Sequence, residues 1–408
     1  MSGHHAVVVG AGIGGLAAAV GLSRSGWNVT VLEQARELRP VGGGIGLTPN
    51  GLHALDAIEA GEAVRAAGIE QEHGGIRNPK GRWISRTDLD FIKTRYGHPV
   101  TAVHRAKLID ILVGLLPAGT VRTGARVLAA LPGGPDEQAE VRTEDGSFHA
   151  DLVIAADGIH SRLRETLFPR NSGLVYAGYT SWRFVLPATD VTLAGETWGR
   201  GKRFAILPLA GGLVHCSALA VRAPGGHDGG GATELAWHFG AWHSPVPELI
   251  HAAAGRTIVH DDIEELAAPL PALHLGRVVL VGDAAHAMTP NLGSACLALE
   301  DAVSLTHAVT SRSLFDALAW YSRVRRPRSA ALAKLSRRLG SLGKISFPPA
   351  AAVRDAGFRV AGLAPALTVR TLDRMMGWRP PPLAPVTDGS AGLRYFQVTG
   401  SFCTPRVR

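Results

Sequence analysis

Cysteine is scarce in this sequence, and several other features are missing. The three cysteines among 408 residues, Cys216, Cys296 and Cys403, have neither the even number of a disulfide framework nor the spacing of metal ligands. We therefore expect a cytoplasmic location and no metal centre. The chain also lacks solenoid-length repeats and low-complexity tracts, and only its N-terminal apolar run approaches the length of a membrane span.

Positive charge is in excess but dispersed. The 42 basic and 34 acidic residues give a net charge of +8, which would suit nucleic acid or an acidic membrane surface. The densest basic cluster, residues 322–338, has no aromatic residues interleaved with its charges, as nucleic-acid platforms require. We interpret it as the solvated face of a helix that Pro327 interrupts. We therefore expect no nucleic-acid partner and no integral membrane association.

The N-terminal segment has the pattern of a nucleotide-binding unit. Ala6–Val9 and Asn28–Leu32 are predicted strands, with a helix between them. A G-x-G-x-x-G motif opens that helix; its glycines are Gly10, Gly12 and Gly15. The first permits a tight turn, the second lets the backbone approach a pyrophosphate, and the third allows close contact between helix and strand. Glu33 ends the second strand, where a carboxylate binds an adenosine ribose and disfavours NADP.

Two further segments favour a flavin over a nicotinamide cofactor. Leu152–Ala156 is a predicted buried strand before Asp157, and Val278–Val281 is another before Gly282 and Asp283. An aspartate at such a strand end can bind a ribitol hydroxyl, while the next helix N-terminus holds a phosphate or a flavin carbonyl. FAD therefore fits all three motifs.

These three motifs, in this order, resemble those of the flavoprotein aromatic hydroxylases. That group has the para-hydroxybenzoate hydroxylase fold (group A monooxygenases), and the salicylate- and urate-hydroxylase-like subset is most similar. Residues 104–112 resemble its arginine-containing helix, and residues 39–58 resemble the loop beside the isoalloxazine ring. The resemblance covers about residues 5–380.

The resemblance implies an α/β fold. A Rossmann-like (GR2-type) FAD-binding domain would be intertwined with a smaller domain whose antiparallel β-sheet covers the flavin, and helices would follow. The implied division is an FAD-binding domain at 1–75, 97–175 and 265–340, a substrate-binding domain at 76–96 and 176–264, a C-terminal helical segment at 341–380, and a tail at 381–408.

The resemblance also implies tightly but non-covalently bound FAD, with NAD(P)H as a transient reductant. The implied FAD contacts are Gly10, Gly12, Gly14, Gly15, Glu33, Gln34, Arg36, Gly44, Gly46, Arg105, Val127, Asp157, Asp283, Pro290, Gly293, Ser294, Ala295 and Cys296. Arg105 would reach the phosphates, and the segment from Gly293 to Cys296 would meet the flavin ring.

On the substrate side, Arg203 and His215 match an arginine and a tyrosine that face the substrate in urate-hydroxylase-like members. Arg203 would either pair with a substrate carboxylate or phenolate, or simply be exposed. Histidine in place of tyrosine adds a group that titrates near neutrality; alternatively, His215 is a half-buried strand residue without a role. Arg183 is a third catalytic candidate, whose alternative is pure packing.

The flavin loop departs from the family pattern P-x-x-G-x-G. After Pro290 the second glycine is absent, and the separation from Pro290 to Glu300 is one residue shorter. Ser294 could still cap the next helix. Either the pyrimidine edge of the flavin is held differently, or the deletion is compensated and the chemistry is unchanged; we favour the second interpretation.

The implied function is that of an FAD-dependent monooxygenase of secondary metabolism. NAD(P)H would reduce FAD, and O₂ would form the C4a-hydroperoxide that hydroxylates, epoxidises or Baeyer–Villiger-oxidises an aromatic or polyketide-type molecule. The alternative is a non-redox cyclase or rearrangement enzyme on the same fold, which the shortened Gly293-Ser294-Ala295 loop would favour. A binding protein without flavin is disfavoured by Glu33, Arg105 and Asp283. We expect a monomer or a homodimer.

Overall fold

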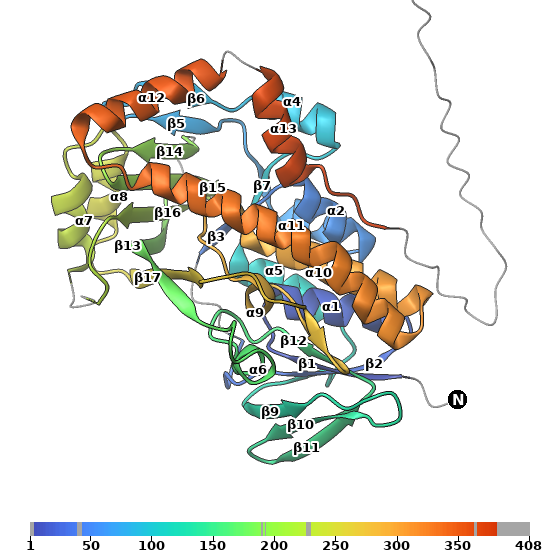
Figure 1. Ribbon diagram of the computed structural model, residues 1–408. Coiled ribbons are helices and arrows are strands. Elements are labelled where there is room, and N and C mark those ends of the chain that lie inside the picture. Colours follow the sequence, from blue (N-terminus) through green and yellow to red (C-terminus); the bar gives the residue numbers. More distant parts are fainter. Residues whose placement is uncertain are drawn as a thin grey trace, which may run out of the picture.

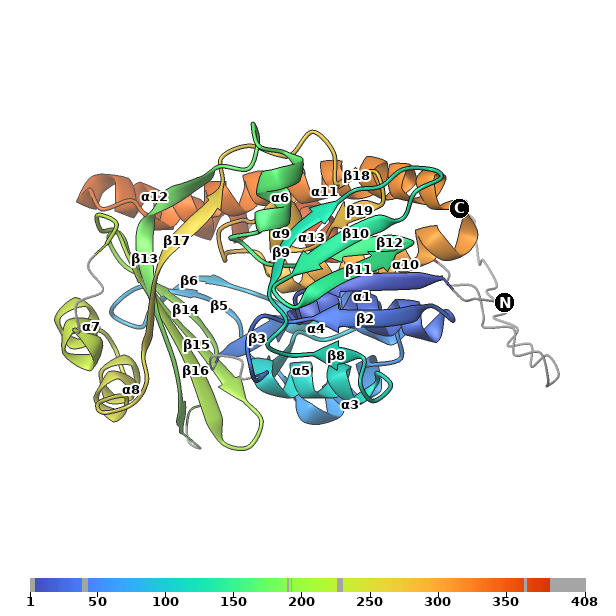
Figure 2. The same cartoon turned by 90° about the horizontal axis from the view of Figure 1, so that it is seen from below.

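The computed structural model describes residues 4–38, 43–188, 191, 193–225, 230–362 and 365–381. Two main sheets lie side by side, and a long helix runs across both (Figures 1 and 2). The predicted α/β class is confirmed. Most of the tail expected at 381–408, with Cys403, lies outside the described residues.

The first main sheet has six strands in the order β18-β19-β12-β1-β2-β8. Their bounds are His274–Leu275, Val278–Leu280, Leu152–Ala155, His5–Val9, Asn28–Leu32 and Val121–Arg122. All neighbours are parallel except the β18–β19 pair. The strands are short, apolar runs, as expected where both faces of a sheet are covered. Helix α1 (Ile13–Arg24) covers one face, and a small three-stranded sheet lies on the other (Figure 1).

The second main sheet has seven strands in the order β17-β13-β16-β15-β14-β5-β6. Their bounds are Val259–Leu266, Leu174–Pro187, Leu213–Ala220, Lys202–Leu209, Gly195–Trp198, Gly75–Arg77 and Trp83–Arg86. Helices α7 (Gly231–Phe239) and α8 (Val246–Ala252) cover one face of it (Figure 2). The β15–β16 turn has positive φ at Gly211 (77°) and Gly212 (69°), the conformation that a tight hairpin of this twist requires.

Two small sheets and several short helices complete the core. One sheet has the order β11-β10-β9 (Gly146–Ala150, Ala139–Thr143, Val127–Leu131), and the other has the order β3-β7-β4 (Gly44–Leu47, Thr101–His104, Ile69–Glu70). The short helices are α2 (Pro49–Ala57), α3 (Gly61–Ala67), α4 (Leu89–Tyr96), α5 (Arg105–Gly114), α6 (Arg162–Leu167) and α9 (Asp283–His286). In the described ranges no helix is both long enough and apolar enough to cross a membrane.

Four helices follow the sheets: α10 (Ser294–Ser311), α11 (Leu314–Gly343), α12 (Pro348–Gly362) and α13 (Pro365–Met376). Pro327 lies inside α11, so the expected interruption there is wrong. The expected solvated face is also wrong in part, because Arg325 has no exposed surface. A proline inside a helix costs about 3 kcal/mol, and buried contacts of the neighbouring turns offset this cost.

Those contacts centre on two adjacent carboxylates of α10. Arg325 donates from Nε to Oδ1 of Asp301 and from Nη1 to Oε2 of Glu300, each at 2.7 Å. Asn50 of α2 and Arg328 also donate to Glu300. Although burial raises the pKa of Asp301, His286 and Arg325 lower it to about 2. We call Glu300, Asp301, Arg325, Arg328 and His286 the carboxylate network.

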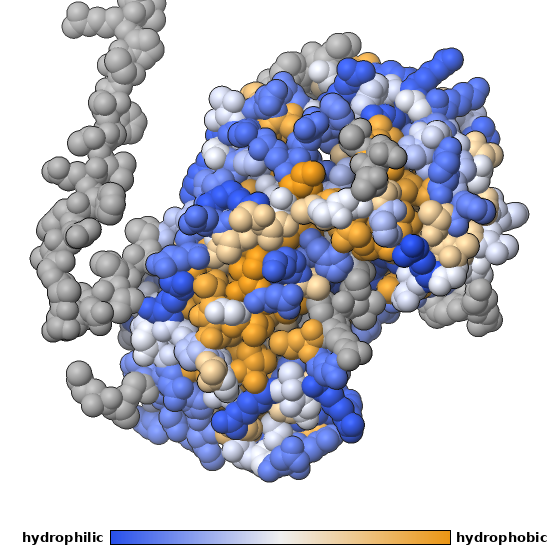
Figure 3. Space-filling model, turned by 180° about the vertical axis from the view of Figure 1, so that it is seen from behind, coloured by the Kyte–Doolittle hydropathy of each residue, from blue (hydrophilic) through white to orange (hydrophobic). Residues whose placement is uncertain are grey.

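Hydrophobic residues also reach the surface. On the face turned away from the viewer in Figure 1, they gather in the centre and polar residues surround them (Figure 3). An apolar surface of this kind suits contact with a ligand or another apolar group.

Arg325→Met should lower the free energy of unfolding by about 3–5 kcal/mol, because it removes the buried cation that the Glu300 and Asp301 carboxylates share. Urea denaturation at pH 7 measures the change. Arg338→Met, at an exposed position of the same helix, should change it by less than about 1 kcal/mol. Equal effects of the two substitutions would show that the carboxylate network does not anchor α11.

Candidate functional site

The glycines after β1 have two different functions. A Cβ at Gly10, where φ is +102°, would lie 2.4 Å from the carbonyl oxygen of Ala156, and one at Gly15 would lie 2.1 Å from the carbonyl oxygen of Gly10. Packing alone therefore requires glycine at both positions. A Cβ at Gly12, the N-cap of α1, would meet no protein atom within 4 Å. Gly12 thus leaves room in front of the positive end of α1, where a phosphate binds.

Glu33 holds this glycine turn against the end of β2. Its carboxylate accepts hydrogen bonds from the backbone N–H groups of Ala11 and Ala35, each at 2.8 Å. The backbone N–H of Ala125 donates to the Glu33 carbonyl at 2.8 Å, which brings the start of β9 and Val127 alongside. Gln34 and Arg36 follow Glu33 and are exposed. The predicted adenosine-binding residues therefore lie around one end of the parallel sheet.

Arg105 and Asp283 come from distant segments of the chain, and their opposite charges attract each other. Arg105 is the first residue of α5, and its backbone N–H donates to the Gly43 carbonyl at 2.9 Å. Asp283 begins α9 directly after β19. Burial raises the pKa of Asp283, while His286, Arg105 and Arg164 oppose the rise. The predicted roles of Arg105 on the phosphates and of Asp283 on the ribitol chain stay predictions.

Asp157 has a structural role in the loop that follows β12. One carboxylate oxygen accepts a hydrogen bond from the Ser161 hydroxyl at 2.6 Å, and the other accepts from the backbone N–H of Leu163 at 3.2 Å. These bonds fix the loop that starts α6. The geometry favours this local structural role over contact with a ribitol hydroxyl.

The flavin loop starts α10 in an unexpected way. Gly293, with φ of 65° and ψ of 61°, is the N-cap, and Ser294 is the first helical residue without capping the helix. The expected Ser294 cap is therefore wrong, because the left-handed cap conformation needs glycine. Asn291 fixes the loop from outside: its amide donates to Thr289 Oγ1 at 2.9 Å and to the Ser336 carbonyl at 3.0 Å.

The Cys296 side chain is buried between the start of α10 and the start of α2. Its sulfur accepts a hydrogen bond from the Thr48 backbone N–H at 3.5 Å and fills the space above Gly51, where a Cβ would lie 2.6 Å from it. Burial raises the pKa of this thiol, which makes it unreactive. The contact of Cys296 with the flavin ring stays a prediction.

The shorter loop does not disturb the helix that follows it. Glu300 and Asp301 remain in the carboxylate network, so α10 has the register that this network needs. The residues between Pro290 and Gly293 absorb the difference in length. This geometry supports a compensated deletion, and nothing in the described part of the chain favours the non-redox alternative.

Arg183, Arg203 and His215 share one face of the seven-stranded sheet. Cross-strand partners point to the same face of a sheet. In this sheet the register pairs Arg183 with Ser217, His215 with Leu207 and Val185, and Arg203 with Leu219. The opposite face is covered by α7 and α8. Ala205, Leu207, Ser217 and Val185, on the same face as the three candidates, are partly exposed.

Arg203 is buried and already paired, so the alternative that its side chain is simply exposed is wrong. It is 4% exposed, and its Nη1 lies 3.8 Å from Oε2 of Glu196. Its guanidinium lies 5.1 Å from the ring centre of Trp198 and 5.7 Å from that of Tyr179. Arg183 is likewise ion-paired with Asp261 of β17.

His215 is buried against β3. It is 9% exposed, and a Cβ at Gly44 would lie 2.7 Å from its Cβ. Burial, together with the charge of Arg183, lowers its pKa to about 4, although the Phe184 backbone opposes the shift. The expected titration near neutrality is therefore wrong, and the imidazole is neutral at pH 7.

Several residues of this site were not predicted. His104 lies opposite Gly44 in the β3–β7 pair and accepts a hydrogen bond from the Ala106 N–H at the start of α5; its position just before Arg105 is a detectable signal. The other unpredicted residues reach the site only through strand register and contacts between distant segments, which a single sequence does not reveal. These residues are Glu196, Tyr179 and Asn291.

Acidification should destabilise the protein through His215. Because its pKa is about 4 in the folded chain and about 6.5 when unfolded, the unfolded state binds more protons between these values. Stability should therefore fall as the pH drops from about 6.5 to 4, by up to about 3 kcal/mol from this residue. His215→Asn should remove that part of the slope in urea titrations. An unchanged slope would contradict the neutral, buried imidazole.

Comparison with known proteins agrees with this geometry. A protein family described as an FAD binding domain matches residues 4–194. The chain is 37% identical to the aurachin C monooxygenase/isomerase of Stigmatella aurantiaca over 345 residues, which cover 83% of this chain and 89% of that protein. It is 33% identical to the 2-heptyl-3-hydroxy-4(1H)-quinolone synthase of Pseudomonas aeruginosa over 353 residues, which cover 84% and 90%.

A solved structure has the same arrangement. Klebsiella pneumoniae HpxO, complexed with FAD and uric acid, superposes with a TM-score of 0.83 and 27% identity, over 90% of this chain and 95% of that one. The fold thus recurs in a protein whose structure was solved with FAD. The chain belongs to the FAD-dependent aromatic monooxygenases of the para-hydroxybenzoate hydroxylase fold, and FAD is its cofactor.

Proposed function

We propose that this monooxygenase hydroxylates an uncharged, fused-ring aromatic molecule of the 4-quinolone type. The observation that carries the proposal is the state of the two arginines on the substrate-facing sheet: Arg203 is ion-paired with Glu196, and Arg183 with Asp261. A benzoate-type substrate brings a carboxylate, which needs a cation when it is removed from water. Here both cations already have carboxylate partners.

The rest of this face also suits a neutral ring. Ala205, Leu207 and Val185 offer apolar contact, and Ser217 offers a single hydroxyl. His215 is neutral and can exchange one hydrogen bond with a ring N–H or carbonyl group without adding charge. A mostly apolar wall with few polar groups is typical of small-molecule sites.

The name of the Pseudomonas aeruginosa relative supports this substrate class. It describes a quinolone that carries a heptyl chain and a ring hydroxyl. Such a molecule has no carboxylate, and its hydroxyl is the kind of group that a monooxygenase introduces. An uncharged ring system of this kind needs no free cation, which agrees with the paired arginines of this chain.

The residues would divide the work as follows. FAD, when bound, supplies electron transfer from NAD(P)H to O₂ and delivery of one oxygen atom. The α1 N-terminus and Arg105 would hold its phosphates, Glu33 its ribose, and the backbone from Gly293 to Cys296 its ring edge. The seven-stranded sheet would exclude water and hold the substrate ring against β3.

Gly12→Ala should weaken FAD binding by at least about tenfold while changing the stability of the apoprotein by about 1 kcal/mol or less. A Cβ at position 12 meets no protein atom, so only the ligand can feel it. Gly15→Ala is the matched comparison, because its Cβ would strike the Gly10 carbonyl and should destabilise the fold itself. Flavin fluorescence titration and thermal unfolding separate the two effects. Undiminished FAD binding by Gly12→Ala would contradict the proposed phosphate site.

The substrate class is tested with FAD-loaded enzyme, NADH or NADPH, and labelled O₂. A 2-alkyl-4-quinolone should accelerate nicotinamide oxidation and give a product with one labelled oxygen atom, whereas 3-hydroxybenzoate and salicylate should not. Turnover of only the carboxylated compounds would overturn the neutral-substrate proposal. A quinolone product of unchanged mass would instead indicate the non-redox alternative.

A further inference from the structure

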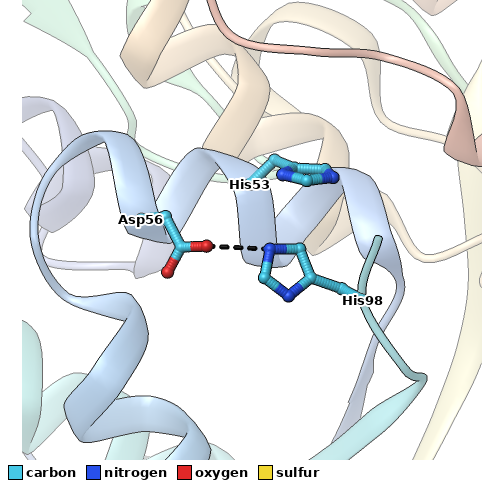
Figure 4. A group of neighbouring side chains, drawn as sticks. All are labelled: His53, Asp56 and His98. Atoms are coloured by element: carbon cyan, nitrogen blue, oxygen red, sulfur yellow. Dashed lines mark ion pairs between the residues drawn. The ribbon is translucent and has the colours of Figure 1, made fainter. Parts of the chain in front are cut away.

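Two histidines and a carboxylate meet beside the C-terminal half of α2, and none of the three is among the predicted cofactor or substrate residues. His53 and Asp56 are three residues apart on α2, so their side chains lie on one face of the helix. His98 follows Gly97, the left-handed residue (φ 84°) that ends α4 and turns the chain back toward α2. The three side chains point toward one another (Figure 4). No signal in the sequence joins position 98 to positions 53 and 56.

We propose that His53, Asp56 and His98 bind one divalent transition-metal ion of the zinc class. One ligand atom from each residue lies within 4.8 Å of the other two. The donors of a tetrahedral zinc ion, with bonds of about 2.1 Å, lie roughly 3.4 Å apart. Rotation of the partly exposed side chains by about an ångström closes the site, and water completes the coordination.

The chemistry of the three donors selects the ion. Two imidazoles and one carboxylate suit zinc, nickel or copper, whereas calcium and magnesium prefer oxygen ligands alone. Nε2 of His53 lies 2.8 Å from the Tyr96 carbonyl, which accepts only, so this nitrogen carries the proton and Nδ1 keeps its lone pair. A backbone carbonyl that orients a histidine in this way is a usual partner of metal ligands.

Neighbouring charges set a limit on the affinity. Arg65 donates to Oδ1 of Asp56 at 2.5 Å, and Arg379 donates to the Tyr96 carbonyl at 2.6 Å. Asp56 keeps Oδ2 on the side of His98, 2.8 Å from its Nε2. Because two cations lie near the site, binding is expected to be weaker than in a structural zinc centre.

A metal here would join two elements that frame the flavin loop. Helix α2 directly follows β3, and His98 lies just before β7, which pairs with β3. An ion held between α2 and residue 98 would thus join the segment that follows β3 to the segment that precedes β7. The site is a stabilising clip, independent of the proposed substrate.

The test uses full-length, FAD-loaded protein that has been washed with EDTA and titrated with ZnCl₂ against a fluorescent zinc chelator. The wild-type chain should bind one zinc ion, and His53→Gln and His98→Gln should each weaken this binding by at least about tenfold. His160→Gln is the matched control, because His160 is an exposed histidine that also lies beside a carboxylate, 3.9 Å from Glu264. It should bind zinc as the wild type does.

Two further readouts make the outcome decisive. Zinc should raise the Tm of the wild type and of His160→Gln but not that of His98→Gln, and retained flavin absorbance shows that each variant is folded. If His98→Gln loses FAD, Asp56→Asn replaces it and should show the same loss of zinc binding. Bound Cu²⁺ should show two nitrogen ligands by electron paramagnetic resonance in the wild type and one in His53→Gln. Equal zinc affinity in the wild type and the ligand variants would overturn the site.

Discussion

The buried pairing of Glu300 and Asp301 with Arg325 is the constraint on which the rest of the molecule depends. Removing a charge from water without a partner costs several kcal/mol, so each of these groups fixes the position of the others. Asp301 also accepts hydrogen bonds from the Gly282 backbone N–H at 3.0 Å and from His286. Glu300 accepts from Asn50 of α2 at 2.7 Å. One pair of carboxylates thereby fixes α2, α10, α11 and the acidic strand end at Asp283 relative to one another.

This constraint explains why a shorter flavin loop is tolerated. Helix α10 is fixed at Glu300 and Asp301, two turns after its first residue, so a deletion before Ser294 cannot rotate it without unpairing Arg325. The change in length must therefore be taken up between Pro290 and Gly293. Asn291, bonded to Thr289 and to the Ser336 carbonyl of α11, fixes that segment from its other side. The loop sequence therefore departs from the family pattern, while the helices around it keep the loop in position beside the predicted flavin site.

The sequence predicted those parts whose signal is local. The glycine turn and the strand that ends at Glu33 both follow from residues that are close together in the chain. Predictions failed where tertiary contacts outweigh local preference. Basic residues after position 322 looked like a solvent-exposed face, yet Arg325 is wholly buried because two distant carboxylates need it. Nothing in the sequence around His215 indicates the burial that keeps its imidazole neutral.

The same long-range logic determines what the substrate face can recognise. Sequence places Arg203 and Arg183 on strands, but only the sheet register shows that Glu196 and Asp261 already neutralise them. The Tyr179 ring lies beside the Arg203 guanidinium, and its hydroxyl lies 3.4 Å from the amide nitrogen of Asn291. The seven-stranded sheet and the flavin loop therefore meet at this tyrosine. Freeing Arg203 for a substrate carboxylate would leave Glu196 without its cation, with the Trp198 indole N–H, 2.5 Å away, still bonded to it, and would disturb the contact between the sheet and the flavin loop. The cost of separating this ion pair would fall on the geometry that holds the cofactor, and this cost is the physical reason for proposing an uncharged ring as the substrate.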